Sequence, residues 1–273
     1  MNLFKRVFQG LAAVALAAAI PAAASAAQCG DNSAGFSAWV DQFKRDASAN
    51  GISPRTLDRA FAEVSYNKAT IRADRGQKSF KLSLDQFMQK RGGQAIINRG
   101  KGLKRQNAAL FARLESQYGV PAGPLIAIWG METGFGGFLG KEHTLSAVAT
   151  LAYDCRRSDY FTNQLYAALN LVQNGTLSTQ ARGAAHGEIG QTQFLPVNVL
   201  KYGVDGDGDG RIDLVRSKAD ALASTANFLR GHGWRAGAGY QPGEPNFAAI
   251  QGWNAANVYQ RAIAIIAAEI DRG

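Results

Sequence analysis

The stretch PAGPLIAIWGMETGFGG, residues 121–137, places a single carboxylate in an almost wholly apolar run. Pro124 is suited to the first turn of a helix, and the glycines from Gly134 onward would end that helix. We therefore predict a short apolar helix with Glu132 on its last turn.

Three effects would raise the pKa of Glu132. The neighbours Trp129, Met131 and Phe135 would desolvate it, no cation adjoins it in the local sequence, and a helix C-terminus carries a negative partial charge. A carboxylic acid that stays protonated near neutral pH is what cleavage of a glycosidic bond requires at the leaving oxygen. An ordinary polar residue at a helix end would give the same local sequence, so this stretch alone does not decide the function.

Apolar residues recur at helical spacing along most of the chain, whereas the alternation typical of strands is scarce. Ser53 followed by Pro54 marks one helix start, and Gly119 marks one helix end. The sequence predicts a mainly α fold that forms one unit without repeats or low-complexity linkers. The predicted helices, besides that around Glu132, cover residues 36–51, 53–64, 103–119, 158–175, 218–233 and 255–270.

The first residues are typical of a secretory signal peptide. Lys5 and Arg6 precede an apolar run over residues 7–20, and a small-x-small site ends at Ala26. The run is short for a membrane span, although a retained anchor is the alternative. We predict a signal peptide over residues 1–26 and an exported chain, 27–273, without a stable membrane anchor.

The charge of the chain favours an anionic partner. Without Lys5 and Arg6, the 30 basic residues become 28 against 21 acidic ones, so the exported chain carries a net charge of +7. Nucleic acid, an anionic membrane or a carboxylate-bearing cell wall would suit this excess. The basic residues are dispersed and form no nucleic-acid motif, so we do not predict a nucleic-acid partner. A plain basic surface remains an alternative.

Cys29 and Cys155 are the two cysteines of the chain. An even number in an oxidising compartment suggests one disulfide, and two free thiols are the alternative. The three histidines show no zinc spacing, so a metal pair is not predicted.

Two further stretches carry candidate ligand groups. Gln191 and Gln193, in GEIGQTQFLP (187–196), would suit the hydroxyl and acetamido groups of a sugar. DGDGDGRIDL (205–214) matches the first half of a calcium-loop template, but its twelfth position is Arg216 instead of a glutamate.

Together these stretches resemble the lytic murein transglycosylase B family of the lysozyme-like superfamily. The resemblance covers nearly all of the predicted exported chain, and its motifs follow the family's order. The motifs are YGVPAGPLIAIWGMETGFG (118–136), ATLAYDCRR (149–157), GQTQFLP (190–196), VDGDGDGRIDL (204–214) and ADALASTANFLRGHGW (219–234).

The resemblance implies a lysozyme-like catalytic domain over residues 27–273 that acts on peptidoglycan glycan strands as a monomer. Glu132 would be the catalytic acid, and later the base. The enzyme would cleave the β-1,4 bond between N-acetylmuramic acid and N-acetylglucosamine, and the C6 hydroxyl of the muramoyl residue would close a 1,6-anhydro ring. No organic cofactor is implied.

The resemblance also implies a set of substrate-binding residues. Phe87 and Phe228 could equally be core residues, and a solvated surface is the alternative for the arginine pair, which would otherwise bind carboxylates of the peptide stem. The set is Gln193, Trp253, Asn254, Tyr259, Phe87, Phe228, Arg156 and Arg157.

The family's calcium loop is EF-hand-like but longer than the standard one, and its last carboxylate comes from the following helix. That loop implies a structural Ca²⁺ site, with Arg216 merely occupying the lengthened loop. Its ligands would be Asp205, Asp207, Asp209, the carbonyl of Arg211 and Asp220.

The chain departs from the family just before the glutamine motif. Where small residues are usual, AHGEIG (185–190) brings in His186 and Glu188. Glu188 could be a second carboxylate near the site, which leaves a hydrolytic muramidase as an alternative to transglycosylation. An inactive, calcium-braced peptidoglycan-binding or scaffold protein is the other alternative.

Overall fold

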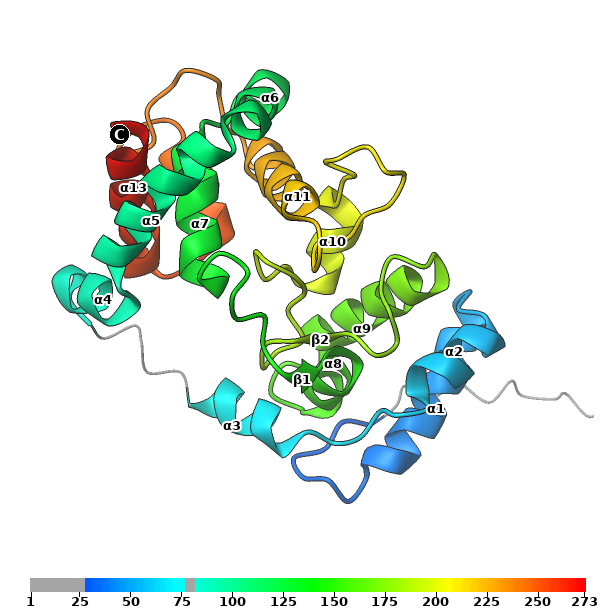
Figure 1. The fold of residues 1–273 in the computed structure, drawn as a ribbon. Helices are drawn as coiled ribbons and strands as arrows, with labels where there is room; N and C mark the ends of the chain where they lie inside the picture. The colour runs from blue at the N-terminus through cyan, green and yellow to red at the C-terminus, as the bar shows by residue number, and fades with distance from the viewer. Residues whose placement is uncertain (1–27, 77–81) are drawn as a thin grey trace, which may run out of the picture.

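The protein is built from helices joined by loops, with two very short strands (Figure 1). A computed structural model describes residues 28–76 and 82–273; the predicted signal peptide, residues 1–26, lies outside the described residues. The elements are α1 (Phe36–Ala49), α2 (Pro54–Phe61), α3 (Lys68–Arg75), α4 (Leu84–Arg91), α5 (Gly93–Gln106), α6 (Ala108–Tyr118), α7 (Ala122–Thr133), β1 (Glu142–His143), α8 (Thr144–Tyr153), α9 (Ser158–Gln173), β2 (Arg182–Gly183), α10 (Pro196–Tyr202), α11 (Lys218–Gly231), α12 (Phe247–Trp253) and α13 (Asn257–Asp271).

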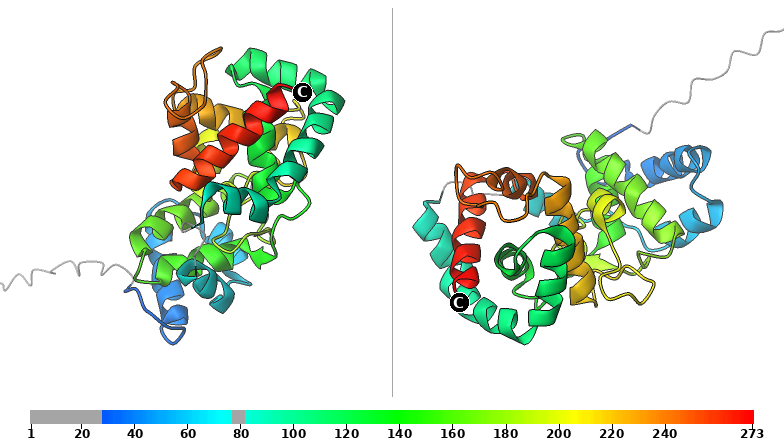
Figure 2. Two further views of the ribbon diagram at one scale, coloured as in Figure 1. Left: turned by 90° about the vertical axis from the view of Figure 1, so that its left-hand side faces the viewer. Right: turned by 90° about the horizontal axis from the view of Figure 1, so that it is seen from above.

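Helix α7 is the predicted apolar helix, and it lies at the centre of a group of helices. Every one of its residues except Glu132 is buried. A helix that is apolar all round has to be covered on every side. Figure 2 shows α7 end-on, enclosed by α13, α5, α6 and α11, all of which contact it. The sequence thus leaves Glu132 as the one residue of this helix that reaches solvent.

The ends of α7 follow from local chemistry. The helix begins at Ala122 behind Pro121, two residues before the predicted start, and ends at Gly134, whose φ of +58° is the left-handed conformation that glycine adopts readily. Gly130 permits a close approach, because a Cβ there would collide with Ile96 of α5 and with Phe135. Glu132 therefore lies on the last turn, as predicted.

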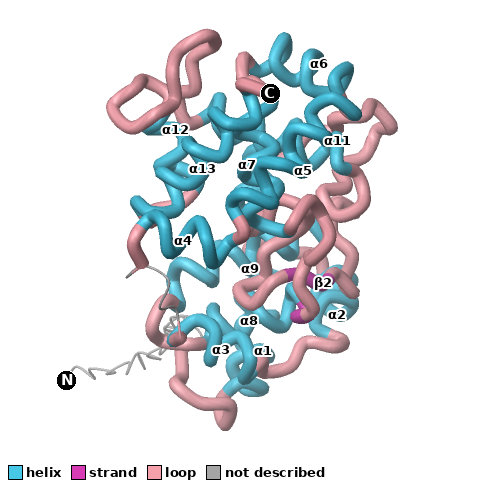
Figure 3. Tube along the Cα trace, turned by 60° about the vertical axis from the view of Figure 1, so that its left-hand side comes forward, coloured by secondary structure: helices cyan, strands magenta, loops and turns pink. Residues whose placement is uncertain are grey.

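The second half of the fold is built around α8, all of whose residues are buried. Helix α9 packs against α8, and α1, α2 and α3 cover the outside of this pair. Strands β1 and β2 pair antiparallel next to α8, and Figure 3 shows them as a small patch among loops.

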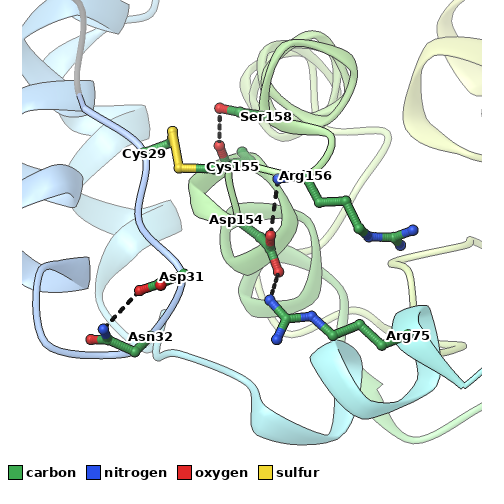
Figure 4. Close-up of a disulfide and its surroundings, with 9 residues drawn as sticks. Cys29, Asp31, Asn32, Arg75, Asp154, Cys155, Arg156 and Ser158 are labelled. Atoms are coloured by element: carbon green, nitrogen blue, oxygen red, sulfur yellow. Dashed lines mark hydrogen bonds and ion pairs between the residues drawn. A yellow bond between two sulfur atoms is a disulfide. The ribbon is translucent and has the colours of Figure 1, made fainter.

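A disulfide fixes the N-terminal segment to this half. Cys29 is bonded to Cys155, directly after α8, across 126 residues of sequence (Figure 4). The predicted pairing is therefore present in the structure.

The structure confirms the mainly α class and corrects some boundaries. The predicted helix over 103–119 is two helices, because Asn107 leaves the helical conformation and its side-chain amide donates to the Leu103 carbonyl. Helices α3, α4, α8, α10 and α12 were not predicted. None of the described helices is long and apolar enough to cross a membrane.

Candidate active site

Glu132 projects from the last turn of α7 toward two hydrogen-bond donors from the end of the chain. Trp253 Nε1 donates to Glu132 Oε1 over 2.9 Å, and the Tyr259 hydroxyl donates to the same oxygen over 2.7 Å. No described residue donates a hydrogen bond to Oε2. This oxygen is also not fully buried, because it is absent from the fully buried side-chain atoms of the described residues that have no hydrogen-bond partner. Oε1 thus accepts hydrogen bonds from two protein donors, whereas Oε2 remains accessible from outside the protein, on what is here called the open side.

The pKa of Glu132 lies above its ordinary value, as predicted. Burial is the largest cause, and the charge of Glu188 adds to it; the hydrogen bonds from Trp253 and Tyr259 and the charge of Arg91 oppose the shift. The pKa of the Tyr259 hydroxyl is also raised, by burial and then by Glu132, so Tyr259 remains a donor. The expectation that no cation is near Glu132 holds for the local sequence only, since Arg91 comes from α4.

Aromatic rings behind the two donors hold them in place. Trp253 packs against Phe194 at 5.3 Å and Phe228 at 5.0 Å between ring centroids, and Phe87 lies edge-on to Tyr259 at 5.7 Å. Phe87 and Phe228 are only 2% and 3% exposed. Both rings offer almost no surface to a substrate in this conformation, and core packing accounts for them.

Gln191 and Gln193 have different roles, although both were predicted as candidate sugar ligands. Gln191 is buried: its Oε1 accepts from Trp129 Nε1 at 3.0 Å, and its Nε2 donates to the Val215 carbonyl at 3.2 Å. It therefore joins α7 to the segment after the acidic loop. Gln193 is partly exposed, with a φ of +56° that is unusual for a residue other than glycine.

The Gln193 side chain links the glutamine motif to the loop that follows α7. Its Nε2 donates to the Gly190 carbonyl at 2.8 Å and to the Leu139 carbonyl at 3.3 Å, which leaves its oxygen without a donor among the described residues. The neighbouring Thr133 hydroxyl donates to the Gln191 carbonyl at 2.6 Å. The glutamine motif and the loop after Glu132 are therefore held as one assembly.

Asn254 occupies the turn between α12 and α13. Its Oδ1 accepts from the Ala256 backbone N–H at 2.9 Å, and its own carbonyl accepts from Gln260 Nε2 at 2.7 Å. These bonds set the direction in which α13 leaves the turn, and so place Tyr259. A part of the side chain remains available, since Asn254 is partly exposed.

Arg156 and Arg157 meet a partner that the sequence did not reveal. Both guanidinium groups form salt bridges with Asp74 of α3, whose side chain is 2% exposed. Next to them, Arg75 pairs with Asp154 at 2.8 Å, as Figure 4 shows beside the disulfide. The arginine pair therefore neutralises a buried carboxylate, and its predicted contact with the peptide stem has to compete with that role.

His186 and Glu188 belong to the same charged network. His186 Nδ1 lies 3.0 Å from Glu188 Oε1, and its backbone N–H donates to Glu188 Oε2 at 2.8 Å. His186 Nε2 lies 3.5 Å from Asp74 Oδ1. Burial raises the pKa of Glu188, but the hydrogen bonds and charge of His186 outweigh it, so the net pKa is lowered and the carboxylate is ionised.

The acidic loop gathers three of the predicted metal ligands. Side-chain oxygens of Asp205, Asp207 and Asp209 lie within 4.8 Å of one another, an arrangement that suits an oxygen-binding divalent cation. Asp220 is not part of this group. Its carboxylate is buried and accepts from the backbone N–H groups of Gly206 at 2.8 Å and Asp213 at 2.7 Å.

In this structure the Asp220 carboxylate lies outside that group, and its role as a metal ligand stays a prediction. Asp220 closes the loop by binding its backbone at both ends. The Arg211 backbone N–H donates to Asp209 Oδ1 at 2.8 Å, which keeps Arg211 beside the acidic cluster. The donor set fits a metal through three carboxylates and the loop backbone.

A family model described as the transglycosylase SLT domain matches residues 35–243, most of the chain. The chain belongs to this transglycosylase family. Of the site residues, Glu132 and Gln193 lie inside the matched range, whereas Trp253, Asn254 and Tyr259 follow it.

Known members of the transglycosylase family resemble the chain in sequence and in fold. SltB3 from Pseudomonas aeruginosa, solved in complex with NAG-anhNAM-pentapeptide, is 30% identical with a TM-score of 0.81, over 87% of this chain and 80% of SltB3. The membrane-bound lytic murein transglycosylase B of Escherichia coli K12 is 37% identical over 140 residues, which are 47% of this chain and 38% of that protein. The match to this curated relative thus spans well under half of its length.

The lytic transglycosylase Slt35 of Escherichia coli, solved in complex with calcium, shares the fold. Its TM-score is 0.74 at 22% identity, over 90% of this chain and 96% of Slt35. These likenesses agree with the lysozyme-like transglycosylase fold predicted from the motifs.

Sequence reasoning missed several residues of the transglycosylase site. Arg91 lies over the Tyr259 ring at 5.7 Å, and its position in a helix that was not predicted hid it. Asp74 gave no signal, because a lone aspartate in a helix is ordinary. Thr133 could have been noticed next to Glu132, but its bond to Gln191 spans 58 residues.

Proposed function

We propose that the chain is a peptidoglycan lytic transglycosylase that cleaves the β-1,4 bond between N-acetylmuramic acid and N-acetylglucosamine. The observation that carries the proposal is Glu132: the one partly exposed residue of a buried helix, with a raised pKa and both donors on a single oxygen. Membership of the transglycosylase family and the likeness to SltB3 with its bound muropeptide support the same activity.

Protein donors on Oε1 determine where the acidic proton sits. Because Trp253 and Tyr259 both donate to Oε1, the proton of neutral Glu132 belongs on Oε2, the oxygen that faces the open side. Burial raises the pKa of Glu132 and so favours this protonated form. Glu132 can therefore protonate the glycosidic oxygen as the bond from that oxygen to the muramoyl C1 breaks.

The same contacts suit the second half of the reaction. Once Glu132 is ionised, the hydrogen bonds from Trp253 and Tyr259 and the charge of Arg91 stabilise its carboxylate. The carboxylate then takes the proton of the muramoyl C6 hydroxyl as that oxygen bonds to C1. Glu132 returns to its neutral form, and no water is consumed. An intramolecular hydroxyl makes a second catalytic carboxylate unnecessary.

Three of the other predicted residues supply substrate contacts in this proposal. The oxygen of Gln193 and the free part of Asn254 would hold sugar hydroxyl and acetamido groups, with Trp253 as an apolar surface beside them. Tyr259 is 6% exposed and acts chiefly on Glu132. Phe87 and Phe228 support these side chains from behind.

We also propose a structural Ca²⁺ at Asp205, Asp207 and Asp209, with the Arg211 carbonyl completing part of its shell. The three gathered carboxylates support this proposal, as does calcium in the Slt35 structure of the same fold. The ion would supply charge neutralisation and rigidity to the loop, and Gln191 would transmit that rigidity to α7.

In the cell, the chain would act after export, as a monomeric domain over residues 27–273 on glycan strands and without a membrane anchor. The disulfide supports export, because such bonds persist in oxidising compartments.

A hydrolytic muramidase is the second candidate, and Glu188 is the observation that favours it. This ionised carboxylate adds to the field at Glu132 and could orient a water. Mass spectrometry of products from purified sacculi separates the two reactions. Transglycosylation gives anhydro ends that lack one water, and hydrolysis gives reducing ends. An inactive scaffold would leave the turbidity of the sacculi unchanged.

A further inference from the structure

A cavity of about 1000 Å³ lies outside the Glu132 site and has no role in the chemistry above. The segment 174–182, between α9 and β2, and the segment 210–216, after the acidic loop, supply most of its lining. Leu139 and Gly140 line it as well. A volume of this size accommodates a short peptide or a large part of one.

The lining of this cavity combines an apolar floor with a cationic rim. Leu171 and Leu214 are buried lining residues that supply apolar surface, here called the floor. Arg182, Arg211 and Arg216 are exposed lining residues, here called the rim. A ligand that carries both methyl groups and carboxylates would match such a surface.

Most of the positive charge of the rim has no acidic partner in the described chain. Asp213 is the one carboxylate among the described lining residues, and it is taken up by Arg216 at 2.6 Å and by two backbone N–H groups. Neither Arg182 nor Arg211 forms a salt bridge with any described residue. Arg182 Nη1 donates to the Lys141 carbonyl at 3.0 Å. The other N–H groups of Arg182 and the whole guanidinium group of Arg211 remain open to an anion from outside.

The cavity adjoins the candidate active site through shared segments. Leu139, which lines it, belongs to the loop directly after α7 and accepts the Gln193 hydrogen bond. Ile189, also in the lining, follows Glu188 and directly precedes the glutamine motif. A branch that extends from a sugar held beside Glu132 would therefore find this cavity next to the site.

We propose that this cavity binds the acidic stem peptide of peptidoglycan, with Arg182 and Arg211 holding its carboxylates and the apolar floor receiving its alanyl methyl groups. This assignment rests on the proposed function, which supplies the branched substrate. In this proposal Arg182 and Arg211 take the place of Arg156 and Arg157 as cationic partners of the peptide, because Asp74 already engages Arg156 and Arg157.

The test measures binding of a free peptide, which needs no glycosidic cleavage. The probe is a synthetic stem pentapeptide of alanine, γ-linked glutamate and diaminopimelate, titrated calorimetrically into the exported chain at fixed calcium. Arg182→Gln combined with Arg211→Gln should weaken binding about tenfold or more, because each substitution removes a charge-assisted contact. Arg55→Gln, an exposed arginine on α2, is the matched control and should bind like the parent.

A second measurement locates the peptide. Backbone amide shifts on titration should concentrate in residues 174–182 and 210–216. The proposal is overturned if the double variant, shown by its melting curve to be folded, binds the peptide like the parent. It is equally overturned if the shifts cluster around residues 154–157. Failure of the proposed function looks different, because the parent would then release no anhydro product even from peptide-free glycan strands.

Discussion

The Tyr259 hydroxyl donates a 2.7 Å hydrogen bond to Oε1 of Glu132, across 127 residues of sequence. This bond opposes the effect of burial on the carboxyl group, because it favours the ionised form. In the proposed mechanism this balance lets Glu132 act first as acid and then as base. Trp253 Nε1 donates to the same oxygen at 2.9 Å and has the same effect.

Tyr259→Phe should lower turnover while leaving the fold intact. Loss of a hydrogen bond to a charged group costs about 1.5–3 kcal/mol, or about 10- to 100-fold in rate. Without that bond the pKa of Glu132 rises further, so the alkaline limb of the pH–rate profile should move to higher pH. Initial rates on soluble glycan strands across pH measure both effects.

Tyr240→Phe is the control for this experiment. Tyr240 is also a hydrogen-bonded tyrosine, but its hydroxyl donates to Asp271 at 2.7 Å and not to Glu132. It should leave the alkaline limb where it is. An unmoved limb in Tyr259→Phe would show that this hydrogen bond does not tune the acid.

Glu188→Gln should move the alkaline limb in the opposite direction. The charge of Glu188 raises the pKa of Glu132, so its removal should make Glu132 ionise at lower pH. The same pH–rate profile shows the shift. Glu115→Gln, an exposed carboxylate on α6, is the control and should not change the profile. An alkaline limb that stays in place in Glu188→Gln would show that the charge of Glu188 does not affect the pKa of Glu132.

The stability of the Glu188→Gln variant should depend on pH. The pKa of Glu188 is lowered in the folded state, so its contribution is present above the ordinary carboxylate pKa and is lost as pH falls through the folded-state value. The variant should therefore be less stable than the parent near neutral pH and converge with it in acid. Urea unfolding at several pH values checks this, and a constant difference would contradict it.

Two substitutions at the acidic loop should lower stability in different ways. Asp209→Ala should abolish most of the rise in melting temperature that calcium produces, because a ligand that binds more weakly stabilises the folded state less. Asp220→Ala should destabilise the protein even in chelator, by about 2–4 kcal/mol, since it leaves two backbone N–H groups unpaired. Calorimetric melting with calcium and with chelator separates the effects.

The two outcomes are distinguishable. A calcium response in Asp209→Ala equal to that of the parent would remove the proposed site. An Asp220→Ala variant that melts like the parent in chelator would show that its backbone contacts carry no weight.

Reduction of the Cys29–Cys155 disulfide should lower stability. The bond closes a loop across 126 residues, and loops of this length contribute about 3–5 kcal/mol through the unfolded state. Thiol labelling of the unfolded, unreduced protein should find no reactive thiol, and the reduced protein should melt earlier. Two labelled thiols before reduction would contradict the pairing.

The sequence was sufficient for features that depend on neighbouring residues. The apolar run of 121–137 predicts α7, Gly134 predicts its end, and the desolvation of Glu132 follows from both. It was not sufficient where the decisive partner is distant. Asp74 meets Arg157 across 83 residues, and Gln191 meets Trp129 across 62. No local pattern indicates such contacts, and a motif identifies the residue without its partner.

Mass spectrometry of the soluble products released from purified sacculi shows whether the protein is a transglycosylase. The parent should release muropeptides with 1,6-anhydro ends. Glu132→Gln should release less by about a hundredfold to ten-thousandfold, while still sedimenting with sacculi, because glutamine cannot donate the proton. Reducing ends from the parent, or near-parental release by Glu132→Gln, would contradict the account.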